Sequence, residues 1–218
     1  MKNAIVTGYS SGIGEAICKM LEPLDYKIIK LTSRLEDLSS LEKEIKTILQ
    51  TDQIDLLVNC AGVGIFKPHE QISLCDIQKL IAINLTAPIV LSNLCLRSLK
   101  KTQGKIINIS SIEATKHSKF SALYTATKSG LRDFGLCLFE EVRKSGVGVT
   151  TINPDITSTN FFDQLHFEPS TSEDCSLLPQ TIAQTLKDIL NTQGVVTDIT
   201  IRPQKFAIVK KNSCFMKK

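Results

Sequence analysis

Short apolar runs alternate with helical patterns along this chain, and the alternation limits its possible folds more than any other feature. The runs predict strands at 3–7, 27–32, 55–59, 105–110, 147–152 and 195–201. Apolar residues recur at three- and four-residue spacing, as on one side of a helix, at 13–21, 40–50, 77–100 and 124–145. Strands that alternate with helices form a parallel sheet with helices on both faces. The sequence therefore predicts an α/β fold.

The stretch after the second predicted strand is unusually short. Only twenty residues separate Arg34 from Asp55. A further parallel strand would need a crossover of about a dozen residues or more, and 35–38 follows the second strand too closely for one. We therefore expect the usual third strand and the helix before it to be missing or vestigial, which leaves a doubly wound parallel sheet of about six strands. We assign 1–203 to this single domain and 204–218 to a C-terminal tail.

A glycine-rich turn, TGYSSGIG, joins the first predicted strand to the first helix. Glycine lets a backbone turn sharply and approach a pyrophosphate with no Cβ in the way. The helix that begins there directs its free N–H groups and positive dipole end toward phosphates, and the two serines add hydroxyl donors. Three glycines alone also suit a tight turn with close helix packing, but their place in the first βα unit favours a dinucleotide site in a Rossmann fold. This site comprises Gly8, Ser10, Ser11, Gly12, Ile13 and Gly14.

The end of the second predicted strand indicates which dinucleotide is bound. An acidic residue there would hydrogen-bond the ribose hydroxyls of NAD and repel a 2′-phosphate. This chain instead has Ser33 and Arg34, which can donate to a phosphate and pair with it. Arg34 could also be a surface arginine near Glu36 or Asp37. We favour NADP(H) over NAD(H).

A tyrosine and a lysine four residues apart on a predicted helix form a candidate catalytic pair. Tyr124 and Lys128 share one side of that helix. Tyrosine has an ordinary pKa of about 10, and a nearby ammonium stabilises the phenolate and lowers that pKa. The pair therefore predicts a tyrosine that exchanges protons with a substrate near neutral pH.

Composition and charge exclude several other classes of protein. The chain is 42% hydrophobic, which suits a globular domain with a full core, and its net charge of +4 is too mild to suggest nucleic-acid binding. No apolar run approaches the ~18 residues of a membrane span. The seven cysteines form no CxxC pair and no metal-ligand spacing. We expect a cytoplasmic protein without a metal site, a nucleic-acid partner or a membrane partner.

Several motifs taken together resemble the short-chain dehydrogenases/reductases. They are the TGYSSGIG turn, the segment Asn59-Cys60-Ala61-Gly62, Asn84 within INLTAP, and Tyr124-x3-Lys128 with Ser111 thirteen residues before the tyrosine. The resemblance runs from Met1 to about Pro203. It implies a Rossmann fold and hydride transfer between a nicotinamide cofactor and a small carbonyl or alcohol.

The resemblance also implies a role for each matching residue. Ser111 would polarise the substrate carbonyl, Asn84 would hold a water that links Lys128 to solvent, and Lys128 would also hold the nicotinamide ribose. Further cofactor contacts would come from Asp37 and Leu38 beside the adenine, from Asn59, Ala61 and Gly62, and from Pro154, the main chain of Ile156 and the hydroxyl of Thr159. The family's Pro-Gly pair reads Pro154-Asp155 here. A homodimer or homotetramer is expected, because the matching long helices pair across a two-fold axis in the family.

Two other functions remain open at this point. A non-catalytic NADP-binding or sensing protein would need only the dinucleotide site, whereas this chain also carries Asn84, Ser111, Tyr124 and Lys128. A sugar-nucleotide epimerase or reductase would need a larger C-terminal substrate domain than 218 residues allow. The sequence favours an NADP-dependent oxidoreductase, with Phe161, Phe162 and Phe167 lining a partly apolar substrate pocket.

Overall fold

A six-stranded parallel sheet forms the centre of the computed structural model, which describes residues 1–172 and 174–211. Its strand order is β2-β1-β3-β4-β5-β7, and every neighbouring pair is parallel. The strands are β1 (Lys2–Val6), β2 (Tyr26–Ile29), β3 (Leu56–Asn59), β4 (Lys105–Ile109), β5 (Gly148–Pro154) and β7 (Asp198–Ile201). The predicted α/β fold and the trimmed sheet are both confirmed, because β2 leads directly to a helix and forms the edge of the sheet.

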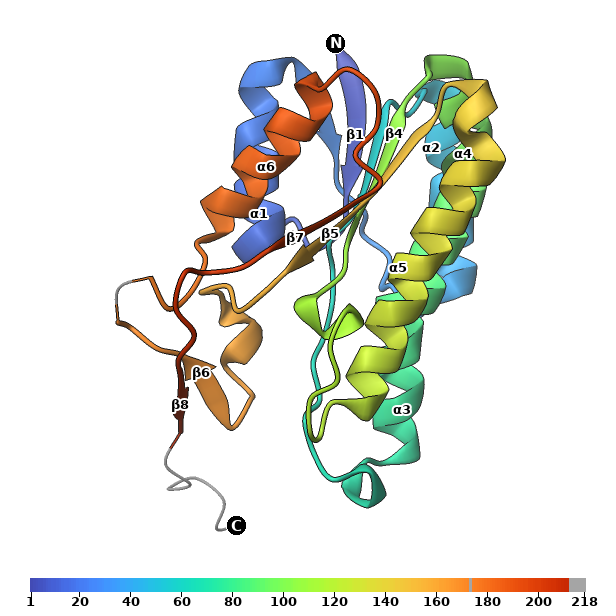
Figure 1. Cartoon of the computed structure of the whole chain (residues 1–218). Helices are drawn as coiled ribbons and strands as arrows, with labels where there is room; N and C mark the ends of the chain where they lie inside the picture. Colours follow the sequence, from blue (N-terminus) through green and yellow to red (C-terminus); the bar gives the residue numbers. More distant parts are fainter. Residues whose placement is uncertain (173, 212–218) are drawn as a thin grey trace.

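Helices cover the two faces of the sheet in separate layers (Figure 1). One face carries α1 (Gly12–Leu21) and α6 (Pro179–Asn191), which pack against each other. The other carries α2 (Leu38–Thr51), α4 (Ala87–Thr102) and α5 (Ala122–Val142). Strand order reverses between β1 and β3, and ligands of such sheets bind at the carboxyl ends of the strands beside that reversal. The glycine-rich turn follows β1 and therefore lies at this position.

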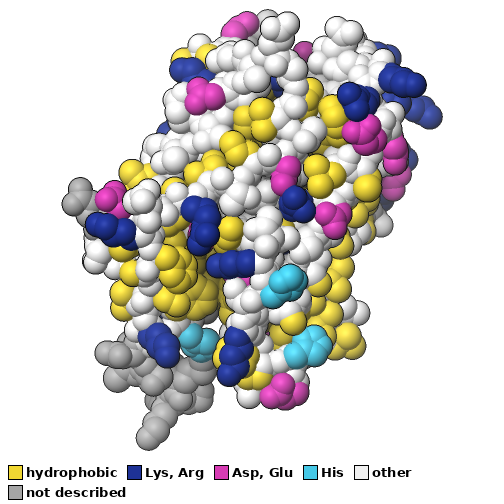
Figure 2. Space-filling model, viewed as in Figure 1, with side chains coloured by type: hydrophobic (Ala, Val, Ile, Leu, Met, Phe, Trp, Pro, Cys, Tyr) yellow, Lys and Arg dark blue, Asp and Glu magenta, His cyan; other side chains and the backbone are white. Residues whose placement is uncertain are grey.

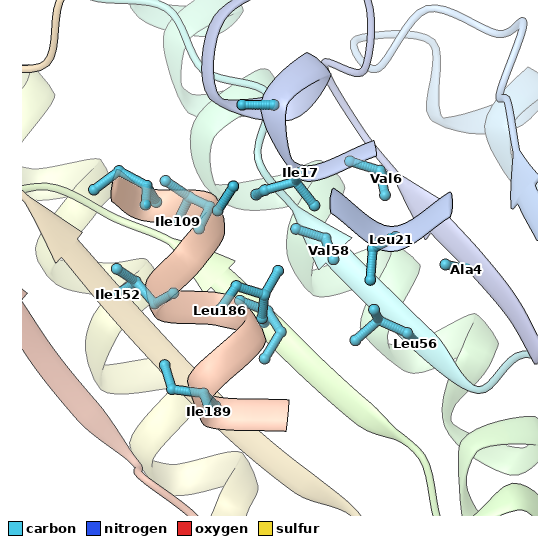
Figure 3. Packing of buried hydrophobic residues seen from close by; sticks show 14 of the residues in the cluster. Ala4, Val6, Ile17, Leu21, Leu56, Val58, Ile109, Ile152, Leu186 and Ile189 are labelled. Carbon is cyan, nitrogen blue, oxygen red and sulfur yellow. The ribbon is translucent and has the colours of Figure 1, made fainter. Parts of the chain in front are cut away.

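The two faces of the sheet have separate hydrophobic cores. Under α1 and α6, side chains of both helices meet alternate residues of β1, β3, β4 and β5 (Figure 3). Ile17 and Leu186 are fully buried in this core. α6 lies beyond the helices predicted above, although Pro179 at its first turn and apolar residues at 182, 183, 186 and 189 were signals for it.

The helix predicted over 77–100 is longer and is not regular. α3 (Leu74–Ile81) continues through a π-helical segment, Ala82–Thr86, into α4. Pro88 explains the change, because proline has no N–H to donate to the carbonyl of Asn84 and its ring crowds that carbonyl. The extra residue per turn places Asn84 in the interior, where it is fully buried.

The same stretch, Leu74–Thr102, is long and apolar enough to span a membrane by length and composition alone. The sequence expectation counted uninterrupted apolar residues and so did not find it. In the fold, α4 packs against α2 and α5, and 44% of the most apolar window is buried. Core helices of globular proteins also pass this test of length and composition.

A small two-stranded antiparallel sheet lies apart from the main sheet. It pairs β6 (Phe167–Pro169) with β8 (Ile208–Lys210), below the carboxyl ends of the parallel strands in Figure 1. Lys211 extends the contact, because its Nζ donates to the carbonyl oxygens of Phe162 at 2.6 Å and Asp163 at 3.1 Å. Residues 204–211, which the sequence analysis assigned to the tail, therefore hold the segment after β5. Cys214 and the rest of the tail lie outside the described residues.

Candidate active site

A cleft of about 570 Å³ opens at the carboxyl ends of β1, β3, β4 and β5. Twelve of the predicted site residues line it: Gly8, Ser11, Gly12, Ile13, Gly14, Ala61, Gly62, Ser111, Tyr124, Lys128, Pro154 and Thr159. Segments far apart in the sequence therefore meet here. The predicted residues that do not line the cleft are Ser10, Ser33, Arg34, Asp37, Leu38, Asn59, Asn84 and Ile156.

The glycine-rich turn packs backbone against backbone. A Cβ on Gly14 would lie 2.1 Å from the carbonyl oxygen of Gly8, and a Cβ on Gly8 would lie 3.0 Å from the Cα of Ala61. Gly8 and Gly12 also have positive φ angles of 68° and 54°. The first hydrogen bond of α1 joins Glu15 N–H to Ser11 C=O. The preceding N–H groups have no partner within the helix and suit a phosphate at this end.

Two buried polar side chains shape the loop after β3. The hydroxyl oxygen of Thr7 accepts hydrogen bonds from the N–H groups of Cys60 and Ala61, at 2.9 and 3.0 Å. Asn84 bonds both backbone groups of Val63, each at 2.9 Å. Asn84 therefore positions the loop from behind the cleft. Asn59 is also buried behind it and donates to Asn108 at 2.9 Å.

Tyr124, Lys128 and Ser111 converge on one wall of the cleft. Tyr124 is 6% exposed and lines the cleft together with Ser111, which follows the end of β4. The Nζ of Lys128 lies 6.0 Å from the centre of the Tyr124 ring and donates to the carbonyl oxygen of Ile109 at 3.0 Å. The spacing along the helix brings tyrosine and lysine to one side, and the end of β4 adds the serine.

The acidity of this pair differs from the sequence expectation. Burial raises the pKa of Tyr124 to about 12, although the hydrogen bond from Ser111 opposes the rise. Burial lowers the pKa of Lys128 to about 8. The lowering of the tyrosine pKa by the ammonium, expected from the sequence, does not appear in this structure, where desolvation is the largest influence on the pKa of each group. Near neutral pH, Tyr124 is a protonated phenol beside a lysine that changes charge close to pH 8.

Of the three residues expected in the turn after β5, Pro154 and Thr159 line the cleft and Ile156 does not. Ile156 is buried, its N–H donates to Asp155 Oδ1 at 2.8 Å, and its carbonyl oxygen accepts from Leu177 N–H at 2.8 Å. Its main chain is therefore engaged within the fold, and Thr157 lines the cleft instead. Asp155 occupies the family's glycine position and is held by Arg202, whose Nε donates to Oδ2 at 2.9 Å. The sequence analysis noted Asp155 only as a departure from the Pro-Gly pair, and it did not single out Thr157.

Aromatic rings close the other side of the cleft. The Phe66 and Phe161 rings lie 5.0 and 6.0 Å from the Tyr124 ring, and Phe66 also contacts Phe167 at 5.3 Å. Phe161 and Phe162 line the cleft, and Phe167 packs behind Phe162. Hydrophobic side chains gather around the β6–β8 sheet in Figure 2, with lysine and arginine side chains beside them. Phe66 was not singled out from the sequence, because it lies in a loop without periodicity.

The residues expected at the adenine end lie outside the cleft. Arg34 is exposed, and its side chain has no hydrogen-bond or ion-pair partner in 1–172 or 174–211. Asp37 caps α2 by accepting from Ser40 N–H at 3.1 Å. The backbone N–H groups of Thr32 and Ser33 donate to the carboxylate of Glu44 on α2, at 2.7 and 2.9 Å.

Comparison with known proteins decides the family. The family model for short chain dehydrogenases matches residues 46–168. The chain belongs to the short-chain dehydrogenase/reductase family. It is 32% identical over 184 residues to a 3-oxoacyl-(acyl-carrier-protein) reductase of Rickettsia prowazekii, with 76% of each chain covered. It is 29% identical over 180 residues to a serine 3-dehydrogenase of Agrobacterium fabrum, with 72% of each covered.

Solved structures share the fold of this short-chain dehydrogenase/reductase. An alcohol dehydrogenase of Thermococcus sibiricus, complexed with 5-hydroxy-NADP, superimposes with a TM-score of 0.84 at 23% identity, covering 94% of this chain and 97% of that one. A metagenomic short-chain oxidoreductase in complex with NADP gives 0.78 at 25% identity, covering 93% and 97%. This chain is thus an oxidoreductase of the short-chain type.

The packing of the glycine-rich turn predicts a large loss of stability for Gly14→Ala. Alanine favours a helix by about 1 kcal/mol over glycine, but its Cβ would collide with the Gly8 carbonyl, which cannot move cheaply. We expect a loss of about 2 kcal/mol or more in the free energy of unfolding, measured by urea titration. Gly130→Ala on α5 is the matched control, because its Cβ would meet only the flexible Leu85 side chain at 3.3 Å. Equal effects of the two changes would contradict the packing argument.

Proposed function

We propose that this protein is an NADP(H)-dependent oxidoreductase that interconverts a carbonyl and an alcohol, with Tyr124 as the proton donor and acceptor. The observation that carries the proposal is the meeting of Ser111, Tyr124 and Lys128 in the cleft that also contains the glycine-rich turn. A protein that only bound the dinucleotide would have no use for these three groups beside the turn.

The residues of the cleft fit a nicotinamide dinucleotide. The pyrophosphate would lie against the start of α1, where the glycines leave no side chain in the way. The nicotinamide end would lie between Lys128 and the turn of Pro154, Thr157 and Thr159. The bound cofactor supplies the hydride. NADP(H) is favoured because the Arg34 side chain is exposed and makes no ion pair or hydrogen bond within the described residues.

The protein's own groups would manage the proton. The phenol of Tyr124 is protonated near neutral pH, so it is ready to donate to a carbonyl oxygen that becomes an alcohol. Ser111 lies beside the phenol and would orient the same oxygen. The ammonium of Lys128 would stabilise the phenolate that remains. A protonated Tyr124 is the form that reduction of a carbonyl requires.

The substrate we propose is a small apolar carbonyl compound. Phe161, Phe162 and Leu165 line the cleft near Tyr124, and Phe66 packs against the Tyr124 ring. The names of the two relatives described above give a 3-oxoacyl-(acyl-carrier-protein) and serine as their substrates, whereas the phenylalanines around this cleft favour an apolar compound.

Replacing the tyrosine tests the proposed chemistry. We expect Tyr124→Phe to lower kcat for carbonyl reduction by about 10²–10⁴-fold, because the proton donor is lost. Affinity for NADPH should change little. Consumption of NADPH in a screen of apolar ketones and aldehydes measures the rate. Tyr26→Phe, the same change on β2 away from the cleft, is the control, and full activity in Tyr124→Phe would refute the assignment.

The depressed pKa of Lys128 predicts a pH profile for reduction. The ammonium is present below pH 8 and is lost above it. Tyr124, with a pKa of about 12, stays protonated throughout. We expect kcat/KM for reduction to be level below about pH 8 and to fall about tenfold per unit above it. A profile that stays level to pH 10, with circular dichroism unchanged, would show that the charge on Lys128 is not needed.

We also propose that two copies of the chain pair through α4 and α5. Half-buried apolar residues, including Leu96, Leu136 and Phe139, remain on these helices, and more than half of the most apolar window of Leu74–Thr102 is not buried within the chain. Sedimentation equilibrium should give about twice the chain mass of 24.1 kDa, or four times it for a tetramer. Leu136→Glu should yield monomers. Leu74→Glu is the control, because Leu74 is 70% exposed on α3, and it should leave the oligomer intact. A monomeric wild-type protein would exclude the pairing.

A further inference from the structure

A carboxylate from α2 lies at the position where dinucleotide-binding sheets distinguish two cofactors. Glu44 Oε1 accepts from the backbone N–H and the hydroxyl of Thr32, at 2.7 and 2.8 Å. Its Oε2 accepts from Ser33 N–H at 2.9 Å. Both residues follow β2 directly. Glu44 thereby uses the main-chain donors that this loop could otherwise offer to a phosphate.

The trimmed connection explains why a helix side chain reaches this loop. Only eight residues separate the end of β2 at Ile29 from the start of α2 at Leu38. With no additional strand and helix between them, α2 packs beside the end of β2. Glu44 lies on its second turn and is half-buried. Burial disfavours its charged form, but the hydrogen bonds from Thr32 and Ser33 outweigh burial and hold the pKa of the carboxyl below its usual value.

Two opposite charges therefore flank Ser33. Arg34 follows it in the chain with an exposed side chain, and Glu44 is bound to its backbone N–H. An acidic group at the end of the second strand favours the free ribose hydroxyls of NAD and repels a 2′-phosphate. In most such sites the acid belongs to the strand end itself, whereas here it comes from a helix about a dozen residues later.

We propose that Glu44 is a specificity-determining residue that weakens binding of the 2′-phosphate and so narrows the preference for NADP(H) that Arg34 creates. The inference rests on the proposed function, because it requires that a dinucleotide binds with its adenine ribose at the end of β2. It predicts a chain that accepts both cofactors, with the ratio of their affinities set by the opposition of Glu44 and Arg34.

Charge-neutral replacement of Glu44 tests the inference. Glu44→Gln keeps an oxygen that can accept from this loop but removes the negative charge. We expect the Kd for NADPH to fall about five- to tenfold, while the Kd for NADH changes less than about twofold. The gain should shrink as salt is raised from about 0.05 to 0.5 M, since the effect is electrostatic. The fluorescence of the bound reduced nicotinamide measures each Kd. The chain has no tryptophan, so tryptophan fluorescence does not interfere.

Glu42→Gln provides the matched control on the same helix. Glu42 is an exposed residue paired with Lys46 on α2, so its loss should leave both affinities unchanged. Arg34→Ala tests the opposing charge and should weaken NADPH by about tenfold without affecting NADH. Urea titration of each variant reports whether the loop and α2 remain folded.

The outcomes separate this inference from the proposed function. An unchanged ratio of NADPH to NADH affinity in Glu44→Gln, with the variant folded, overturns the role of Glu44 and leaves the oxidoreductase proposal intact. Equal tightening of both cofactors also overturns it, because a general change in the loop would then be the cause. A wild-type protein that binds neither cofactor overturns both proposals.

Discussion

The close contact between the glycine-rich turn and the loop after β3 is the constraint on which the rest of the structure depends. Gly14 leaves room for the carbonyl of Gly8, and Gly8 leaves room for Ala61. This contact brings the start of α1 against the end of β3 and sets where the cleft opens. The side chains of Thr7 and Asn84 hold the same loop from behind through hydrogen bonds to its backbone. A Cβ on Gly62 of that loop would lie 3.2 Å from Lys128 Nζ, so the end of the lysine side chain would have to shift.

Burial gives the candidate active site its chemistry. Tyr124 and Lys128 are taken out of water together, and desolvation moves both toward their neutral forms. A protonated phenol beside a lysine that titrates near pH 8 suits proton donation to a carbonyl. The phenylalanines that pack around Tyr124 help to exclude water from it, and the same side chains would contact the apolar substrate that we propose.

This chain departs from the family pattern at both ends of the candidate cofactor site. At the adenine end, α2 takes the place of the missing elements and brings Glu44 to the loop after β2. At the nicotinamide end, Asp155 replaces the expected glycine, and its carboxylate is divided between Ile156 N–H and Arg202. Arg202 follows β7, and residues 204–211 continue from there into β8, which pairs with β6. The C-terminal segment therefore braces the turn after β5 and the aromatic wall, both of which border the cleft.

The sequence by itself determined the features that depend on local spacing. Alternating strands and helices fixed the parallel sheet, the short stretch after Arg34 fixed its trimmed edge, and a four-residue interval placed Tyr124 and Lys128 on one side of a helix. Tertiary structure decided what depends on contacts between distant segments. Desolvation raised the pKa of Tyr124, for which the sequence predicted a lowered value. Hydrogen bonds to Asp155 and Leu177 engaged the main chain of Ile156, and Thr157 lines the cleft instead. Packing brought Phe66 beside Tyr124 and Glu44 beside Ser33. Spacing along one element is a property of the chain alone, whereas burial and long-range pairing exist only once the elements have packed together.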